Sequence, residues 1–429
     1  MFAHVGKKNI DSMLSGSVIA IILITITLIL ALGSVKFGLM SLLPNVFPAL
    51  ITFGIWGIAV GQVDLGVAVV FSLTLGIVVD DTVHFFSKYQ RARNQLGQSS
   101  ADAVRYAFQT ENQLTFPVSA PGSAGMETCF VNLVEPGDKV IVCQNGVFGG
   151  RMKENVERCG GVAVMVQDDW GQPVSVEKLA EALAQNPDAR VVAFVHAETS
   201  TGVCSNAAAI SALAQQHDCL TIMDCVTSLA GVPVLIDEWG IDAAYSGTQK
   251  CLSCPPGLSP VTFSARAIER VKARKTKVQS WFLDLSLVMN YWADGGGARS
   301  YHHTAPINAM YGLHESLLLV KEEGLEAVWA RHAAHHATLR DGLIALGFEY
   351  LVAPEYRLPQ LNAVIVPERF KANEGAIRGQ LLAEHNLEIG GGLGALAGSV
   401  WRIGLMGYGA SQTNVDICLK QLEALAEPS

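Results

Sequence analysis

Three long apolar runs dominate the first 86 residues of the chain. They cover residues 15–35, 44–61 and 64–86, and the first two contain no charged side chain. A helix that crosses a bilayer needs about 20 mostly apolar residues. One such run by itself is equally typical of a buried helix in a soluble protein, but three in succession favour three transmembrane helices.

The rest of the chain alternates short apolar runs with longer amphipathic stretches. The apolar runs 139–144, 191–196 and 220–225 predict buried parallel strands. The stretches 176–186 and 206–217 predict helices between them. We therefore expect an open, mostly parallel α/β sheet whose functional site lies at the carboxyl ends of its strands.

This alternation stops near residues 262–275, and the last part of the chain predicts helices with a small sheet. We therefore expect three parts. They are a three-helix transmembrane part at 1–107, a large α/β domain at 108–310 and a small C-terminal α/β subdomain at 311–429.

Charge divides the chain in the same way. Residues 1–110 carry seven basic and five acidic side chains, whereas residues 111–429 carry 23 basic and 34 acidic ones. All nine cysteines lie in the second part without a spaced framework, which indicates reduced thiols in a reducing compartment. The acidic balance argues against a nucleic-acid partner.

The basic residues around the third apolar run predict an orientation. The cluster 88–93, together with Arg105, is the densest group of positive charge and is expected on the cytoplasmic side, although Lys7 and Lys8 oppose this weakly. Residues 15–86 would then contact membrane lipid, and everything after residue 94 would lie in the cytoplasm.

The apolar part resembles a family of exporters. "GLMSLLPNVFPALITFGIWG" and "GIVVDDTVHFFSKYQRAR" resemble late transmembrane segments of the RND/MMPL superfamily, over residues 10–108. The resemblance implies a bacterial inner membrane. Ionisable groups inside a span are costly and usually functional, so Asp80, Asp81 and His84 are expected to have a role in the parent exporter, with contact with water at a helix end as the alternative. Three helices cannot shield a polar path, so we do not expect this chain to transport anything by itself.

Two features of the second part are candidates for cofactor binding. Residues 119–138 form a loop of small residues that runs into a helix, where free N–H groups and the helix dipole suit a phosphate, although such loops are often only turns. Asp224 ends a buried strand, where it either caps the next turn or pairs with a protonated ring nitrogen.

Two cationic side chains complete the set. Lys250 lies alone among small and turn residues in 246–257, and Arg402 lies in an otherwise apolar strand within 400–409. A buried arginine requires an anion such as a carboxylate. A phosphate loop, an aspartate, a lysine and an arginine are what pyridoxal phosphate chemistry requires, because the lysine forms a Schiff base and the aspartate keeps the ring nitrogen charged.

Seven segments then resemble one enzyme family. They are "FQTENQLTFPVSAPGSAGMET", "HAETSTGV", "DCVTSLAG", "YSGTQKCLSCPPG", "RSYHHTAPINAMYGLHESL", "EIGGGLGALAG" and "WRIGLMG". Together they resemble the alanine–glyoxylate/serine–pyruvate aminotransferases of class V, over residues 108–425. The resemblance implies the pyridoxal phosphate fold type I, a homodimer, and transfer of an amino group from alanine or serine to glyoxylate or pyruvate.

The resemblance also assigns roles to residues. Lys250 matches the Schiff-base lysine, Asp224 the partner of the pyridine nitrogen, and Arg402 the group that binds the substrate carboxylate. Val226 would pack on one ring face, Phe148 would stack where relatives often have tryptophan, and Thr199 would bond to the ring hydroxyl. The phosphate would be held by Gly122, Ser123 and Gln249, with Tyr301 and Thr304 from a partner subunit.

The chain departs from this family in two places. Pro121 stands where relatives usually offer a hydroxyl, and proline also lacks an N–H donor, which predicts weaker phosphate binding. The family's N-terminal arm is missing, and "FQT" at 108–110 fits both resemblances. We therefore expect a fusion of two truncated genes, natural or artefactual, with impaired dimerisation and turnover.

Other functions remain as alternatives at this point. One is a non-catalytic fusion product or a membrane fragment of an exporter. A cysteine desulfurase would need a reactive cysteine on a late mobile loop, but only Cys418 follows Cys254, and it lies in an apparent helix.

No metal site is expected, because Cys251 and Cys254 lack a second pair of ligands and packing explains five histidines better. These histidines are His302, His303, His332, His335 and His336.

Overall fold

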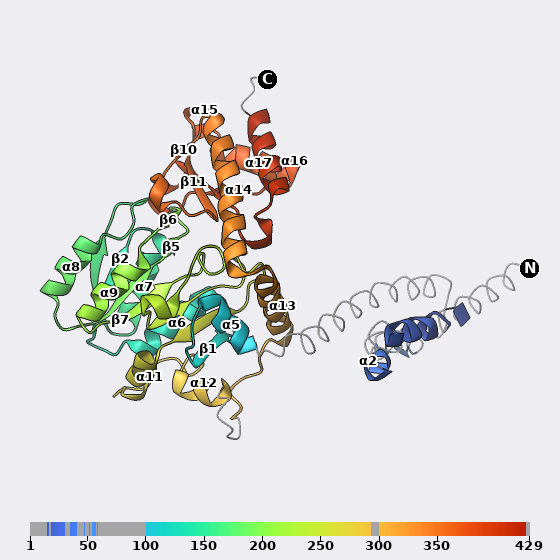
Figure 1. Ribbon diagram of the computed structural model, residues 1–429, viewed down its shortest axis with the longest axis horizontal. Coiled ribbons are helices and arrows are strands. Elements are labelled where there is room, and N and C mark those ends of the chain that lie inside the picture. The colour runs from blue at the N-terminus through green and yellow to red at the C-terminus, as the bar shows by residue number, and fades with distance from the viewer. Residues whose placement is uncertain are drawn as a thin grey trace, which may run out of the picture. The chain divides into compact units, whose positions relative to one another are not determined.

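The computed structural model describes residues 15–16, 19–30, 35–40, 47, 51, 54–56, 58, 100–292 and 300–425. The chain divides into two compact units, Met1–Gln98 and Ser99–Ser429. Each unit is described by itself, and the elements of both are drawn in Figure 1.

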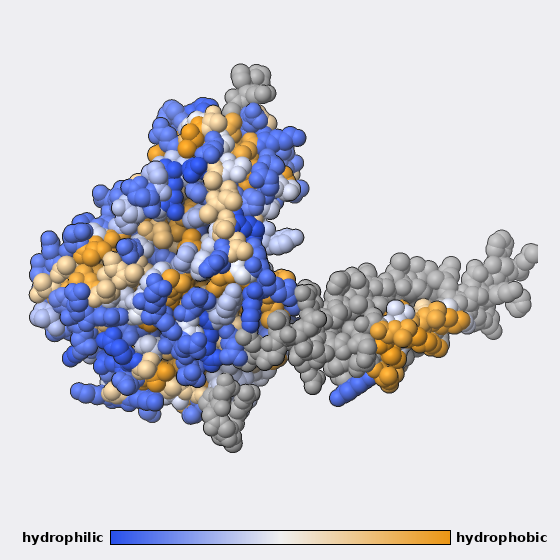
Figure 2. Space-filling view, in the orientation of Figure 1, coloured by the Kyte–Doolittle hydropathy of each residue, from blue (hydrophilic) through white to orange (hydrophobic). Residues whose placement is uncertain are grey.

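The described residues of the first unit are helical. Residues 19–30 are helical, and so is α2 (Val35–Met40). Large apolar side chains are exposed along both, as with Leu30 at 76 %, and Figure 2 shows these residues as strongly hydrophobic. Over the part of the chain that the structure describes, however, none of the helices combines the length and the apolar character needed to cross a bilayer.

The three predicted transmembrane helices therefore gain no support from the structure. The run 64–86, with Asp80, Asp81 and His84, lies outside the described residues, and so does the basic cluster 88–93. The orientation, the lipid contact and the membrane location that were inferred from them stay predictions.

The second unit is built on a seven-stranded sheet in the order β1-β9-β8-β7-β4-β2-β3. β3, β2, β4, β7 and β8 run parallel to one another, while β9 is antiparallel to both of its neighbours. The expected mostly parallel sheet is thus confirmed. The strands are β1 (Leu114–Val118), β2 (Lys139–Gln144), β3 (Val162–Gln167), β4 (Ala189–Val195), β7 (Leu220–Asp224), β8 (Ala243–Tyr245) and β9 (Ser259–Phe263).

Helices bury both faces of this sheet, which explains why its strands are continuous apolar runs. Alternate residues of one strand enter different cores: Ile141 of β2 packs in one cluster and Val142 in the other. One face is covered by α6 (Gly122–Leu133), α7 (Val147–Arg158), α11 (Ala265–Lys272) and α12 (Leu285–Trp292). The opposite face is covered by α5 (Ser100–Phe108), α8 (Val176–Gln185), α9 (Ala207–Gln216), α10 (Ile236–Trp239) and α13 (Ile307–Glu323).

A smaller antiparallel sheet follows in the order β10-β11-β13-β12. It consists of β10 (Glu349–Tyr350), β11 (Leu361–Ile365), β12 (Gly390–Gly391) and β13 (Val400–Gly404), and it packs with α14 (Leu325–Ala345), α15 (Glu368–Lys371), α16 (Glu374–His385) and α17 (Gln412–Ala424). Its core holds Trp401 and is separate from those of the large sheet. Residue 311, where the small subdomain was expected to begin, lies inside α13, whose Leu313 and Leu317 still pack in the core of the large sheet.

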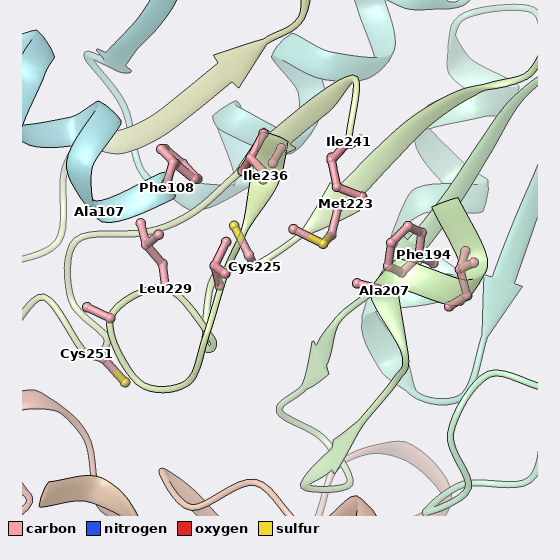
Figure 3. Close-up of a cluster of buried hydrophobic side chains, with 14 of the residues drawn as sticks. Ala107, Phe108, Phe194, Ala207, Met223, Cys225, Leu229, Ile236, Ile241 and Cys251 are labelled. Atoms are coloured by element: carbon pink, nitrogen blue, oxygen red, sulfur yellow. The ribbon is translucent and has the colours of Figure 1, made fainter. Parts of the chain in front are cut away.

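Helix α5 belongs to the second unit, although we expected residues up to 107 to be part of the exporter-like segment. Ala103, Val104, Ala107 and Phe108 are at most 1 % exposed and lie in the core of the large sheet. Figure 3 shows Ala107 and Phe108 among side chains of the sheet and the loops that follow its strands, including Cys225 and Leu229. Phe108, the first residue of the "FQT" segment, is therefore the last residue of a packed helix, and the division between the two units falls in the sequence between Gln98 and Ser99.

Replacing Phe108 with alanine tests this packing. The change removes a ring that is 0 % exposed, so we expect the free energy of unfolding of the second unit to fall by about 3–5 kcal/mol. The measurement is urea unfolding followed by near-ultraviolet circular dichroism. Tyr408→Ala, which removes a ring from a residue that is 89 % exposed, should change the free energy by less than about 0.5 kcal/mol. Equal effects of both substitutions would show that α5 is not part of the core.

Candidate active site

The candidate site begins where three neighbouring parallel strands end. Val195 of β4 is paired in register with Asp224 of β7, and Asp224 is paired with Tyr245 of β8. The segments that follow these strands carry Thr199, Val226 and the stretch up to Lys250. Ligands of open α/β sheets bind outside the carboxyl ends of the strands, so the sheet brings three separate sequence motifs to one place.

Asp224 is a buried carboxylate at the centre of this edge. It is 3 % exposed and accepts hydrogen bonds from the N–H of Val226 at 2.9 Å and the hydroxyl of Tyr245 at 2.8 Å. Burial raises the pKa of its carboxyl to about 7, even though both hydrogen bonds favour the ionised form. Among the described residues it forms no ion pair within 4.0 Å. A cation placed beside it would therefore be stabilised.

Lys250 lies in the turn after β8 and is half-buried. Burial lowers the pKa of its amine, and the positive charge of Arg402 lowers it further, whereas the negative charge of Asp224 raises it. Lys250 is thus close enough to both Arg402 and Asp224 for their charges to act on its amine. A lysine amine with a lowered pKa is more often uncharged at neutral pH, and the uncharged amine is the nucleophile and the base.

Arg402 reaches toward this site from β13 of the small sheet. Its Nε donates to the carbonyl of Gly391 at 2.8 Å, and its Nη1 donates to the carbonyl of Thr199 at 3.2 Å. Within the described part of the chain it has no carboxylate within 4.0 Å, and burial lowers its pKa. A half-buried guanidinium that is held only by two carbonyls is suited to receive an anion.

The predicted phosphate residues gather around Val226. A β carbon added to Gly122 would lie 3.6 Å from Val226 and 3.5 Å from the carbonyl oxygen of Ser246. One added to Gly247 would lie 2.8 Å from Oε1 of Gln249 and 3.5 Å from Val226. The amino end of α6 therefore faces the turn that carries Gln249 and Lys250, which places the dipole and N–H groups of a helix end beside the lysine.

The residue before this helix differs from the usual hydroxyl donor, as the sequence indicated. Pro121 is the N-cap of α6 and forms no side-chain capping bond, and its carbonyl accepts the N–H of Ala124 at 2.7 Å. Ser123, in the first turn, is exposed. Any phosphate at this end depends on backbone N–H groups and the Ser123 hydroxyl, because proline supplies neither donor.

Phe148 and Thr199 are connected through one buried segment. The N–H of Phe148 donates to Oε2 of Glu198 at 3.2 Å, and the guanidinium of Arg151 lies 4.7 Å from the centre of the Phe148 ring. The hydroxyl of Thr199 accepts from that of Thr227 at 3.2 Å. Two predicted ring-binding residues are thus positioned by the segment around Glu198, because Phe148 bonds to Glu198 and Thr199 follows it in the chain.

Tyr301 and Thr304 are not brought to the site within one chain. Both are exposed, and their hydroxyls form a hydrogen bond of 2.9 Å with each other. Among the described residues, no hydrogen bond connects either of them to the turn that carries Lys250. This arrangement agrees with the expectation that they act on a partner subunit, which stays a prediction.

Two residues of the site were missed in the sequence. Tyr245 donates to Asp224, and Glu198 accepts from Phe148 while its charge acts on both Asp224 and Arg402. Glu198 stands inside "HAETSTGV", where an acidic residue among small polar ones directly after a buried strand was a usable signal. Tyr245 gave no such signal, because an aromatic residue in an apolar strand is typical of any core.

The other candidate ligands have structural partners. Cys251 contacts the carbonyl of Thr227 at 3.5 Å, and Cys254 contacts that of Gly312 at 3.3 Å. His332 lies between the carbonyl of Val328 at 2.7 Å and the N–H of Gly407 at 2.9 Å. Over the described residues there is no group of three or more potential metal ligands.

Comparisons with known proteins agree with this geometry. The family model described as "Aminotransferase class-V" matches residues 84–415. The alanine–glyoxylate aminotransferase of Rattus norvegicus is 37 % identical over 352 residues, which are 82 % of this chain and 84 % of the relative. The (S)-ureidoglycine–glyoxylate transaminase of Bacillus subtilis is 34 % identical over 342 residues, or 76 % and 81 % of the two chains.

The similarity to alanine–glyoxylate aminotransferases extends to the fold of a solved structure. The alanine–glyoxylate aminotransferase of Nostoc sp. superposes with a TM-score of 0.74 at 43 % identity, and the match covers 76 % of this chain and 85 % of that one. These comparisons give no support to an exporter segment, to a fusion or to impaired activity, and the class V match begins at residue 84, inside the stretch that we had assigned to an exporter. The chain belongs to the class V aminotransferase family and is, by family, a pyridoxal-phosphate-dependent transaminase.

Proposed function

We propose that this protein transfers the amino group of a small amino acid, alanine or serine, to glyoxylate or pyruvate. The support is the similarity to aminotransferases named for alanine and glyoxylate, together with the charged residues gathered at the site. The observation that carries the proposal is the assembly of Asp224, Lys250 and Arg402, from three distant segments, around one end of the sheet.

The charges of these three residues fit pyridoxal phosphate and an amino acid. Asp224 is a buried carboxyl with a raised pKa and lacks a cation among the described residues, which suits a protonated pyridine nitrogen. Arg402 is a half-buried cation with no carboxylate within 4.0 Å among the described residues, which suits the carboxylate of the substrate. When bound, pyridoxal phosphate supplies the electron sink on which the exchange of amino groups depends.

The chain's own residues would do the positioning and the proton transfer. Arg402 binds the α-carboxylate and so orients the α-carbon of the amino acid toward Lys250. The uncharged Nζ of Lys250 takes the proton from that carbon and later returns it, which the lowered pKa of this amine favours. Asp224 stays ionised beside the cationic ring nitrogen, and Tyr245 holds its carboxylate in place.

A second group of residues around the site indicates where the phosphate would lie. The amino end of α6, at Gly122 and Ser123, offers backbone N–H groups and the positive end of the helix dipole. Gln249 lies against Gly247, and a β carbon added to Gly122 would lie 3.7 Å from the Cα of Gly247. We further propose a homodimer in which Tyr301 and Thr304 of one subunit reach the phosphate site of the other, because both hydroxyls are exposed in the single chain.

The proposed function is tested first with Lys250→Ala. We expect the wild-type chain to acquire visible absorbance when pyridoxal phosphate is added and to convert alanine and glyoxylate into pyruvate and glycine. Removing the amine should lower turnover by at least about a thousandfold, because it removes both the nucleophile and the base. The control is Lys272→Ala, an exposed lysine at the end of α11. Absence of cofactor-dependent turnover in the wild type would reject the proposal.

Arg402→Gln tests substrate recognition. Loss of a charge-assisted pair with the carboxylate should raise KM for the amino acid by about 10- to 100-fold, with a smaller effect on kcat. Steady-state kinetics with alanine and glyoxylate measure the changes in KM and kcat separately. Arg158→Gln, which removes a guanidinium that is 78 % exposed, should leave both constants unchanged. If kcat falls while KM stays constant, Arg402 does not bind the substrate in its ground state.

Asp224→Asn tests the buried charge through stability. The pKa of Asp224 is raised on folding, from 3.8 to about 7, so its contribution to stability is present at low pH and is lost as the pH rises through about 7. In the cofactor-free protein, the asparagine variant should therefore gain stability relative to wild type between pH 5 and pH 8, by on the order of 2–4 kcal/mol. Urea unfolding at the two pH values measures this. A constant difference at both pH values would show that Asp224 is ionised throughout.

A further inference from the structure

Glu198 is a buried acid beside the site that the proposed chemistry does not use. It ends β5 (Ala197–Glu198), which pairs with β6 (Val203–Cys204) in a two-stranded hairpin, and it is 0 % exposed. Its Oε2 accepts the N–H of Phe148 at 3.2 Å, and its Oε1 accepts the N–H of Ser200 at 3.0 Å. The hydroxyl of Ser200 also donates to Oε1. A buried carboxylate with this many donors is a fixed anchor rather than a mobile group.

The hairpin caps helix α7 from outside the helix. The first N–H groups of a helix have no partner within it, and the N-cap of α7 is Gly146, which has no side chain to offer. Instead, the N–H of Val147 donates to Oγ of Ser200 at 3.0 Å and the N–H of Phe148 donates to Glu198. The carboxylate also lies at the positive end of the helix dipole, where a negative charge is favoured.

Close packing leaves little freedom where Gly146 contacts the β5–β6 hairpin. A β carbon added to Gly146 would lie 2.4 Å from Cδ of Glu198 and 2.4 Å from Oγ of Ser200. Only glycine allows the chain before α7 to approach the hairpin this closely. The peptide of Phe148 is thereby fixed relative to the strand ends that carry Asp224.

The charge of Glu198 also acts on the site. Burial raises the pKa of its own carboxyl, while its hydrogen bonds and the positive charge of Arg151 favour the ionised form. Its negative charge raises the pKa of Arg402, against the lowering effect of burial, and it also raises that of Asp224. The carboxylate therefore lies within electrostatic range of the two groups that would hold the substrate and the ring nitrogen.

We propose that Glu198 is a positioning residue for the cofactor ring: by holding the amide of Phe148 in the first turn of α7, it fixes the aromatic side chain on which pyridoxal stacks. This inference rests on the proposed function, because it concerns the construction of the cofactor site. The Phe148 ring is half-buried, and the Arg151 guanidinium, one helical turn away, lies over it at 4.7 Å. Without the bond to Glu198, the ring would lose the support that aims it at the site.

A double-mutant cycle between Glu198→Gln and Phe148→Ala tests this role in the full chain. The Kd for pyridoxal phosphate is measured by fluorescence quenching of the cofactor-free protein, and the visible circular dichroism of the bound cofactor reports its orientation. Glutamine keeps the shape of the side chain but removes the charge and one acceptor, so we expect weaker binding and a smaller dichroic band. Since Glu198 acts through the ring, the effects of the two changes should be non-additive by at least about threefold in Kd.

Glu135→Gln is the matched control. Glu135 is also a nearly buried carboxylate, and its Oε1 accepts from the N–H of Lys275, the N–H of Thr276 and the hydroxyl of Thr276, each at 2.9 Å. It is paired with Arg270, and among the described residues no hydrogen bond connects its side chain to the amino end of α7. Its effect on Kd should be small, should add to that of Phe148→Ala, and should leave the dichroic band unchanged.

The possible results separate the two proposals. If the wild type binds pyridoxal phosphate and the effects of Glu198→Gln and Phe148→Ala are additive, the positioning role is wrong while the proposed function stands. If the wild type does not bind the cofactor, both fail. If Glu198→Gln does not fold, the cycle is repeated with Ser200→Ala, which removes the cap on Val147 and one donor to Glu198, and additivity there has the same meaning.

Discussion

A buried carboxyl at the end of a central strand is the constraint on which the site depends. Asp224 is paired on both sides, with Val195 and with Tyr245, so its backbone cannot move without breaking the sheet. Ionising a carboxyl at such a position is costly unless a cation lies beside it. Lys250 lies within electrostatic range of Asp224 but forms no ion pair with it, which leaves the place of the cation open for a ring nitrogen.

The loops around Asp224 are held first by the sheet, and hydrogen bonds such as that between Thr227 and Thr199 then join them to one another. Each follows a strand whose alternate residues enter two different cores, so the strand ends have fixed positions. The hairpin β5–β6 then connects these ends to α7 through Glu198 and Ser200. The small sheet adds Arg402, whose bond to the carbonyl of Thr199 ties the two sheets together at the site. Precise placement of charged groups by rigid elements is what catalysis of this kind needs.

The start of the second unit changes the interpretation of the apolar part of the chain. Helix α5 is amphipathic and buries Val104 and Phe108 against the large sheet, so it is a structural part of the enzyme unit. A short amphipathic helix carries little information about its context, which is why the sequence alone led us to assign this stretch to an exporter-like segment. The family match from residue 84 onward agrees with assigning α5 to the aminotransferase.

The sequence by itself predicted the parallel sheet and the family, and it singled out Lys250, Asp224 and Arg402, to which we assign the proposed chemistry. Strands buried on both faces must be continuously apolar, and lone charged residues in apolar or small-residue surroundings stand out from such a background. The tertiary structure alone decided that Tyr245 and Glu198 belong to the site, that α5 is part of the core, and that Gly146 permits the hairpin to cap α7. These facts depend on contacts between segments far apart in the chain, such as Phe148 and Glu198, and local sequence patterns carry no record of which distant group lies at the other end of a hydrogen bond.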